Sequence, residues 1–210
     1  VLHTAYRRQR QMGIRDGGRT YEGRRLIHAV VTSTDNQESL DQIQRANRRA
    51  ATAPTQVSDE DLQDRPAVVL MGYSIHGDEA SGTEAAILLL YHLAAGSGPD
   101  VEAALENAVT LIDPMFNPDG RDRFVDWVNG NRGGTPTADP QDREHNQPWP
   151  GGRTNHYWFD LNRDWLPAQH PSSQGRLDYF HNWKPQVLTA FPEMASFSYT
   201  HLTLPTTCRV

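Results

Sequence analysis

The sequence predicts an α/β fold with a mostly parallel sheet, because segments typical of strands and of helices alternate along the chain. Two continuous apolar runs of strand length, AVVLMGY at residues 67–73 and AVTLID at residues 108–113, lack polar alternation. Such runs are typical of strands that helices cover on both faces. Between them, residues 83–95 are apolar nearly all round, which predicts a helix packed inside a layer of the fold.

The first predicted strand lies at residues 24–33, where RRLIHAVVTS is rich in β-branched and apolar side chains. Asp35 and Glu38 then signal the start of a helix that continues to about residue 50. The inner face of this helix would carry the apolar side chains at helical spacing, which are Leu40, Ile43, Ala46 and Ala50.

A long segment without clear periodicity, residues 114–171, is rich in Gly, Pro, Asn and Asp. A loop of that length is usually either functional or disordered. Its aromatic side chains favour an ordered, functional loop: Trp127, Trp149, Tyr157, Trp158 and Trp165. Residues 172–183 then predict a helix and PQVLTAF, from Pro185, another strand. In one α/β domain of this kind, sites form beyond the carboxyl ends of the strands.

Composition excludes several classes of function. The chain has 210 residues and a formal net charge of -6, so it lacks the basic footprint of a nucleic-acid-binding protein. It has no apolar run long enough to span a membrane. Cys208 is the single cysteine, which excludes a disulfide framework and a cysteine-rich zinc site. A small or peptidic ligand is the expected partner, and His and carboxylate side chains are the expected ligands for any metal.

A candidate pair of metal ligands follows the strand at residues 67–73. In SIHGDEASG, His76 and Glu79 are three residues apart where the chain leaves the sheet and starts a helix. Residues at this spacing share a face of a helical turn, so an imidazole and a carboxylate can converge on one Zn²⁺. The alternative is structural: His76 would cap the loop and Glu79 would be a solvated acid in the first turn.

Two more motifs follow predicted strands: FNPDGRDRF at residues 116–124 and FDLNRDW at residues 159–165. Together with SIHGDEASG, and in this order, they resemble the zinc metallocarboxypeptidase family, the carboxypeptidase A-like peptidases. The resemblance covers about residues 20–195 and includes GRTYEGRRL and WKPQVLTAFPEM. It implies a three-layer α/β/α fold with a mixed sheet, a Zn²⁺ cofactor, peptide substrates with a free C-terminal carboxylate, and an extracellular or periplasmic protein.

The resemblance also assigns residues to roles. It makes His76 and Glu79 zinc ligands, and Asn162 and Arg163 the pair that holds the terminal carboxylate of the substrate. A guanidinium fork matches a carboxylate, and the amide adds a donor. The alternative for Arg163 is an ion pair with one of its neighbours, Asp160 or Asp164.

The family also uses an arginine to polarise the scissile carbonyl and stabilise the oxyanion. Arg132 is the expected residue for this role, with Arg121 and Arg123 as competitors that could instead brace the loop. Residues 117–120, Asn-Pro-Asp-Gly, are interpreted as a structural turn. The remaining histidines lack ligand spacing, and His92 is expected to be a packed or hydrogen-bonded side chain of its helix and not a ligand.

The chain departs from the family at its third ligand. Relatives have a His where this sequence has Pro192, and an acidic residue where it has Ala190. Proline offers no lone pair to zinc, whereas a catalytic zinc takes three protein ligands and a water. Residues 1–195 are expected to form a peptidase domain that is incomplete on its C-terminal side, since the general base and specificity pocket of the family lie further on. Residues 196–210 are interpreted as a tail foreign to the family pattern.

Three hypotheses follow. The leading one is a zinc metallocarboxypeptidase that removes C-terminal residues from peptides, with this sequence itself inactive. The second is a catalytically dead relative that binds peptide C-termini through Asn162 and Arg163 without zinc. The third is a zinc amidohydrolase of small N-acyl amino acids. Metal content separates the first from the second.

Overall fold

The computed structural model describes residues 12–63 and 65–193, so the predicted tail at 196–210, with Cys208, lies outside the described residues. The strands are β1 (Met12–Arg19), β2 (Arg25–Val31), β3 (Ala67–Tyr73), β4 (Ala108–Asp113) and β5 (Val187–Phe191). The α-helices are α2 (Thr34–Glu38), α3 (Leu40–Thr52), α4 (Asp59–Gln63), α5 (Ala80–Ala95), α6 (Pro99–Asn107), α7 (Pro118–Asn131) and α8 (Pro171–Trp183).

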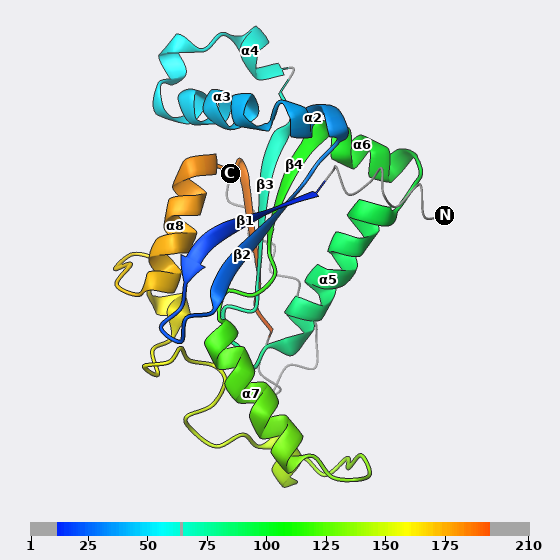
Figure 1. Ribbon diagram of the computed structural model, residues 1–210, viewed down its shortest axis with the longest axis vertical. Helices are drawn as coiled ribbons and strands as arrows, with labels where there is room; N and C mark the ends of the chain where they lie inside the picture. Colours follow the sequence, from blue (N-terminus) through cyan, green and yellow to red (C-terminus); the bar gives the residue numbers. More distant parts are fainter. Residues whose placement is uncertain (1–11, 64, 194–210) are drawn as a thin grey trace.

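One five-stranded sheet with the order β1-β2-β4-β3-β5 forms the centre of the molecule (Figure 1). β3 pairs in parallel with β4 and with β5, whereas β2 pairs antiparallel with β1 and with β4. The α/β fold with a mixed sheet is therefore confirmed, although parallel and antiparallel pairings are equal in number within the described chain. The antiparallel half begins with β1, which the sequence analysis did not predict.

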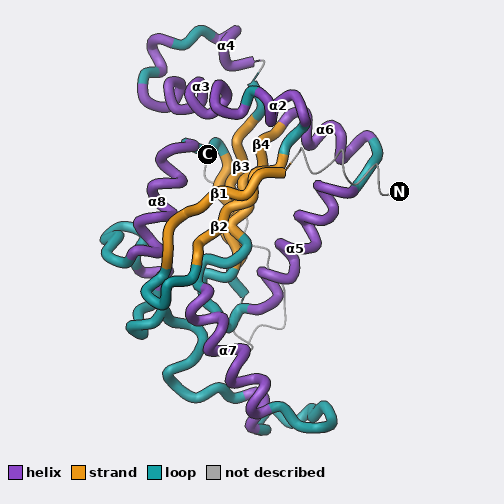
Figure 2. Tube along the Cα trace, in the orientation of Figure 1, coloured by secondary structure: helices purple, strands orange, loops and turns teal. Residues whose placement is uncertain are grey.

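Helices cover both faces of the sheet, as the three-layer prediction requires (Figure 2). On one face, α5 and α6 bury Ala86, Leu93, Val101 and Leu105 against alternate strand residues. On the other face, α3 and α8 bury Leu40, Tyr179 and Trp183 against the intervening strand residues. None of the described helices combines the length and the apolar character needed to cross a membrane.

The predicted burial of α5 is only half right. Its inner side is buried, but Leu88 is 68% exposed, Tyr91 is 73% exposed and His92 is also exposed. Apolar residues all round a helix favour burial on all sides, yet within the described chain nothing packs over this outer face. The packed position expected for His92 is therefore wrong.

Two other helices differ from the prediction near their ends. The helix expected at residues 35–50 is divided at Ser39 into α2 and α3, and Ser33 caps α2 by accepting a hydrogen bond from the Asn36 N–H. On α3 the buried inner positions are Leu40 and the polar Asn47, whose amide donates to the carbonyl oxygen of Trp183. Asn47 thereby links α3 to the end of α8.

The Asn-Pro-Asp-Gly segment begins a helix, so its interpretation as a turn is wrong. Asn117 is the N-cap of α7: its side-chain oxygen accepts from the Gly120 N–H at 3.0 Å. Pro118 stands at the first helical position, where its missing N–H costs nothing. The same residues that favour a turn therefore also favour a helix start.

A polar cluster is buried between the sheet and α8. His28 Nδ1 lies 3.4 Å from Asp113 Oδ2, and the His28 ring stacks on Tyr179 with 3.8 Å between centroids. Arg176 is also buried here. Burial lowers the pKa of His28 to about 4 and raises the pKa of Asp113 to about 8. Because the two pKa values differ between the folded and the unfolded chain, the stability of the fold depends on pH.

We expect stability to fall between about pH 6.5 and pH 8. Unfolded Asp113 loses its proton near pH 3.8 and folded Asp113 near 8, so between these values the folded state holds the extra proton and stability falls by up to about 1.4 kcal/mol per pH unit. His28 acts in the opposite sense from about pH 4 to 6.5 and offsets this loss there. The raised pKa of His76 adds to the fall above pH 6.5, so urea unfolding at pH 5 to 8 should show that Asp113→Asn makes the fall smaller.

The matched control is Asp126→Asn, at an exposed site on α7. This variant should keep the pH dependence of the unaltered chain. If Asp113→Asn keeps it as well, the assignment to the buried carboxyl is wrong.

Candidate functional site

The candidate site lies at the carboxyl ends of β3 and β4, where the two following loops run together. The Phe116 N–H donates to the Tyr73 carbonyl at 3.0 Å, and the Asn117 N–H donates to the Ser74 carbonyl at 3.2 Å. The Ser74 hydroxyl donates to the Glu79 carbonyl at 2.7 Å. These bonds fix the short loop between β3 and α5 that carries His76 and Glu79.

His76 is held between two carboxylates. Its Nδ1 lies 2.6 Å from Glu79 Oε1 and its Nε2 lies 2.9 Å from Asp160 Oδ1, while the ring is 3% exposed. Burial acts to lower the pKa of His76, but the hydrogen bonds to Glu79 and Asp160 outweigh it and raise the pKa above its ordinary value. The sequence spacing therefore did bring the imidazole and the Glu79 carboxylate together.

Asp160 connects this pair to the DLNR segment. The Asp160 Oδ1 that contacts His76 also accepts the backbone N–H of Asn162 at 2.9 Å, which caps the 3₁₀ turn at Leu161–Arg163. Burial alone would raise the pKa of Asp160, but the Asn162 N–H and the His76 ring hold it below its ordinary value. One oxygen atom thus joins the candidate metal ligand to the candidate carboxylate clamp, Asn162 and Arg163.

Among residues 12–63 and 65–193, the Arg163 guanidinium has no ion-pair partner. It is exposed, and its NH1 donates to the Asn162 carbonyl at 3.2 Å. Asp160 bonds His76 and Arg153, and the buried Asp164 accepts backbone N–H groups at residues 169 and 170. Within the described chain, neither of the two aspartates that could have paired with Arg163 does so.

Arg153 is the basic residue that the sequence analysis missed. Its NH2 lies 3.1 Å from Asp160 Oδ2 and its NH1 lies 3.8 Å from Glu79 Oε1, and about half of the side chain is exposed. The sequence did contain a signal for the position of this arginine, because Gly151 and Gly152 precede it. In the structure the Gly152 carbonyl accepts the Gly77 N–H at 2.9 Å. Glycines allow such close approach of two loops.

Arg132, the predicted oxyanion residue, is not brought to this cluster. It is exposed and caps the C-terminal end of α7, whose N-terminal end lies beside Gly77. α7 points away from the sheet in Figure 1. A helix of 14 residues is about 21 Å long, so Arg132 at its C-terminal end lies roughly that distance from Gly77. Arg123 braces the loop instead, donating to the carbonyl oxygens of Gly151 and Asn155 at 3.0 and 3.2 Å.

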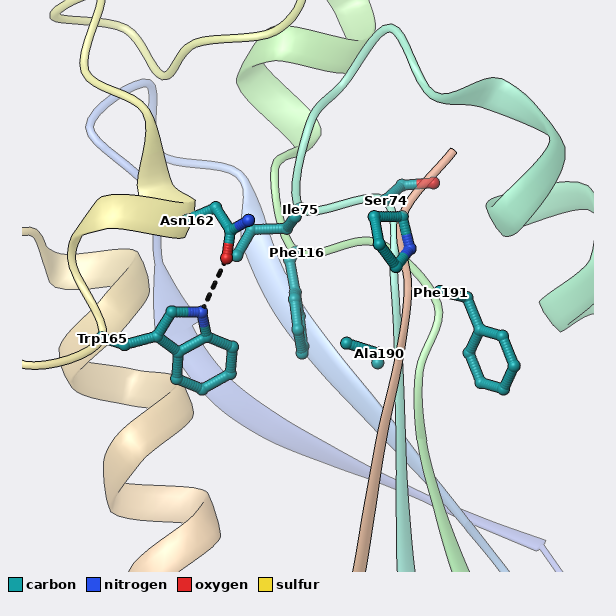
Figure 3. Close-up of a pocket in the computed structure, with 9 residues that line it drawn as sticks. Ser74, Ile75, Phe116, Asn162, Trp165, Ala190 and Phe191 are labelled. Carbon is teal, nitrogen blue, oxygen red and sulfur yellow. Dashed lines mark hydrogen bonds between the residues drawn. The ribbon is translucent and has the colours of Figure 1, made fainter. Parts of the chain in front are cut away.

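Pro192 follows β5 at the edge of the same site. The next residue, Glu193, donates its backbone N–H to Glu79 Oε2 at 3.0 Å. A cavity of about 30 Å³ lies beside it. Figure 3 shows the residues that line this cavity, among them Ala190, Phe191, Phe116 and Asn162. Position 192 therefore precedes the residue whose N–H bonds the Glu79 carboxylate.

The donors present fit a zinc ion only in part. A carboxylate on the second ring nitrogen of a histidine is the usual support of a zinc ligand, and Asp160 supplies it to His76. However, no group of three His, Cys, Asp or Glu side chains in the described residues could hold a metal ion. His76 and Glu79 bond each other, and Pro192 has no donor atom. This set does not match the three protein ligands of a catalytic zinc.

Comparison with known proteins supports the interpretation of the motifs. The family model described as zinc carboxypeptidase matches residues 3–193. No curated protein matches the sequence.

Solved structures share the fold. A putative carboxypeptidase from Burkholderia mallei has a TM-score of 0.54 at 19% identity, over 90% of this chain and 37% of that one. Carboxypeptidase A from Helicoverpa armigera has a TM-score of 0.54 at 15% identity, over 98% and 47%. Thrombin activatable fibrinolysis inhibitor has a TM-score of 0.57 at 13% identity, over 90% and 44%. The chain therefore spans less than half the length of these three structures.

Proposed function

The chain belongs to the zinc carboxypeptidase family, and from that membership we propose that Asn162 and Arg163 bind the C-terminal carboxylate of a peptide. The activity we assign to the whole protein is zinc-dependent removal of C-terminal residues, in an extracellular or periplasmic setting. The proposed clamp and two of the expected ligands, His76 and Glu79, lie within the described residues. We therefore expect this sequence by itself to bind peptide ends without hydrolysing them.

The observation that carries the proposal is the shared Asp160 oxygen. Because it bonds both His76 Nε2 and the Asn162 N–H, the candidate ligand and the clamp keep a fixed relation to each other. The Arg163 guanidinium keeps its fork free of carboxylates of the described chain, so a substrate carboxylate can take it in a bidentate, charge-assisted bond. The clamp can in this way select a chain end over an internal peptide bond.

We assign to Arg153 the role that the sequence suggested for Arg132. Its half-exposed guanidinium lies beside Glu79 and Asp160, where it can donate to the carbonyl oxygen of the terminal peptide bond. In the absence of substrate it offsets the charge of these two carboxylates.

A second candidate function, binding of peptide C-termini without any zinc, is favoured by Pro192. The described residues contain no third metal ligand, and Glu79 has both oxygens engaged by His76 and the Glu193 N–H. Zinc titration of the purified chain tests this second candidate. Tight, stoichiometric zinc would reject the second one.

Arg163→Ala is the test of the clamp. Loss of a charge-assisted hydrogen-bonded pair should weaken binding of a free-carboxylate peptide roughly tenfold to a hundredfold. Binding of the same peptide with a C-terminal amide should change little, because the amide offers no negative charge. Isothermal titration of both peptides against residues 1–210 measures the ratio of dissociation constants.

Arg143→Ala is the matched control, because Arg143 lies in a 3₁₀ helix on the long loop outside the site. It should leave the ratio unchanged. Equal binding of the acid and amide peptides by the unaltered chain would show that the clamp does not recognise a carboxylate.

A further inference from the structure

We propose that Trp165 and Arg176 are positioning residues of the carboxylate clamp. Trp165 fixes which side of the Asn162 amide meets the substrate, and the buried Arg176 holds the Trp165 ring in place. This inference rests on the function proposed above, since it assigns a means of orienting the same clamp. It concerns residues that no motif of the sequence analysis placed in a binding role.

The first step is the hydrogen bond between the two side chains. Trp165 Nε1 lies 3.1 Å from Asn162 Oδ1, and Figure 3 shows this bond with the amide nitrogen on the opposite side. The indole N–H is a donor only, so it can face the carbonyl oxygen of the amide but not its NH₂ group. Trp165 therefore determines the orientation of the amide.

The consequence is a pair of free donors in the site. No acceptor within residues 12–63 and 65–193 takes the Asn162 Nδ2 hydrogens, and Asn162 lines the cavity at the end of β5. A flipped amide would present its oxygen to the substrate and repel a carboxylate. In the observed orientation the amide presents donors, which is what a carboxylate needs.

The second step is the support beneath Trp165. The Arg176 guanidinium carbon lies 4.3 Å from the Trp165 ring centroid and 4.4 Å from that of Phe116, and Arg176 is 3% exposed. Burial lowers the pKa of Arg176 to about 10, so the side chain remains a cation at neutral pH. Cations are attracted to the faces of aromatic rings, most strongly when they are shielded from water. Arg176 is thus a cation packed over two rings that also contact each other edge to face, with 6.1 Å between their centroids.

Arg176 has few hydrogen bonds, and besides the two rings its charge interacts with the carboxyl groups of Asp113 and Asp164. Its NH2 donates to Ser173 Oγ at 3.2 Å, whereas its Nε and NH1 have no hydrogen-bond partner in the described chain. Phe116 is fixed in turn, because its ring occupies the space where a side chain at Gly72 would lie. Phe116, Arg176 and Trp165 therefore form one cluster in which each side chain contacts the other two, and Trp165 bonds Asn162.

Trp165→Phe tests the inference because it keeps an aromatic ring against Arg176 and removes only the N–H donor. The preference of residues 1–210 for a free-carboxylate peptide over its amide should fall roughly fivefold to tenfold, the effect of one hydrogen bond. Arg176→Met, which removes the charge, should change the preference in the same direction. The readout is a ratio of two dissociation constants, so a uniform loss of folded protein does not alter it.

Two further variants make the result decisive. Trp127→Phe, on α7 and outside the site, should leave the preference unchanged. Asn162→Ala should reduce it at least as much as Trp165→Phe does. If Asn162→Ala lowers the preference and Trp165→Phe does not, the positioning role is overturned while the clamp stands. If Asn162→Ala also has no effect, the proposed function itself fails.

Discussion

Replacement of Pro192 by His is expected to raise the affinity of residues 1–210 for zinc by roughly a hundredfold to a thousandfold, the contribution of one additional strong ligand. The position is suitable because the N–H of the next residue, Glu193, already bonds the Glu79 carboxylate. An imidazole at residue 192 would start beside Glu79 and His76 and complete a set of three donors. Zinc titration at pH 7 measures the change.

Pro192→Ala is the control, since it removes the proline ring without adding a donor, and it should keep the weak affinity of the unaltered chain. His76→Ala combined with Pro192→His should return the affinity to that weak level, because two donors remain. Zinc binding by Pro192→His that is no tighter than by Pro192→Ala would show that position 192 does not face the site.

Gly77→Ala is expected to lower the free energy of unfolding by about 4 kcal/mol or more, the range of the most damaging single substitutions. A Cβ at Gly77 would lie 2.1 Å from the Gly120 carbonyl carbon and 2.1 Å from the Arg121 nitrogen. Both are backbone atoms at the start of α7, so no side-chain rotation relieves the overlap. The loop that carries His76 would have to move away from α7. Thermal and urea unfolding measure the loss.

Gly130→Ala is the matched control for the same chemical change. Gly130 lies inside α7, where an added Cβ meets no atom within 4 Å. Alanine is favoured over glycine in a helix, so this variant should gain about 0.5 to 1 kcal/mol. If the two Gly→Ala substitutions change the free energy of unfolding in opposite directions, the loss at Gly77 arises from the contact between the loop and α7. A stable Gly77→Ala variant would contradict that contact.

The buried strands were predictable because their signal is local. The continuous apolar runs at β3 and β4 gave the observed bounds, since strands covered on both faces have no polar side to blur the pattern. β1 carries Gly17 and Gly18 and is half exposed, so its sequence gave no such signal. α6 was also missed, although Pro99 at its first turn, with Asp100 and Glu102, is typical of a helix start.

Only the part of the candidate site that depends on short spacing along the sequence was predictable. His76 and Glu79 are three residues apart on one loop, so their meeting follows from local geometry. The choice of arginine depends instead on how the long loop folds back over the β3 loop. That contact joins Gly77 to Gly152, and sequence separation alone does not distinguish Arg153 from Arg132. Asn117 caps the start of α7, and this helix runs from there away from the site. Arg132, at the other end of the helix, is therefore far from the site.

The hydrogen bonds of Arg123 to the long loop determine which substitutions the loop can accept. Arg123 binds the loop through main-chain oxygens of Gly151 and Asn155. Every amino acid has such an oxygen, so the anchor is indifferent to most side chains that the loop presents outwards, including exposed ones such as Tyr157 and Trp158. Substitutions there can alter what the loop touches, while these bonds and the one from the Gly77 N–H to the Gly152 carbonyl still hold its course. The exposed side chains of the loop can therefore change during evolution while the fold stays the same.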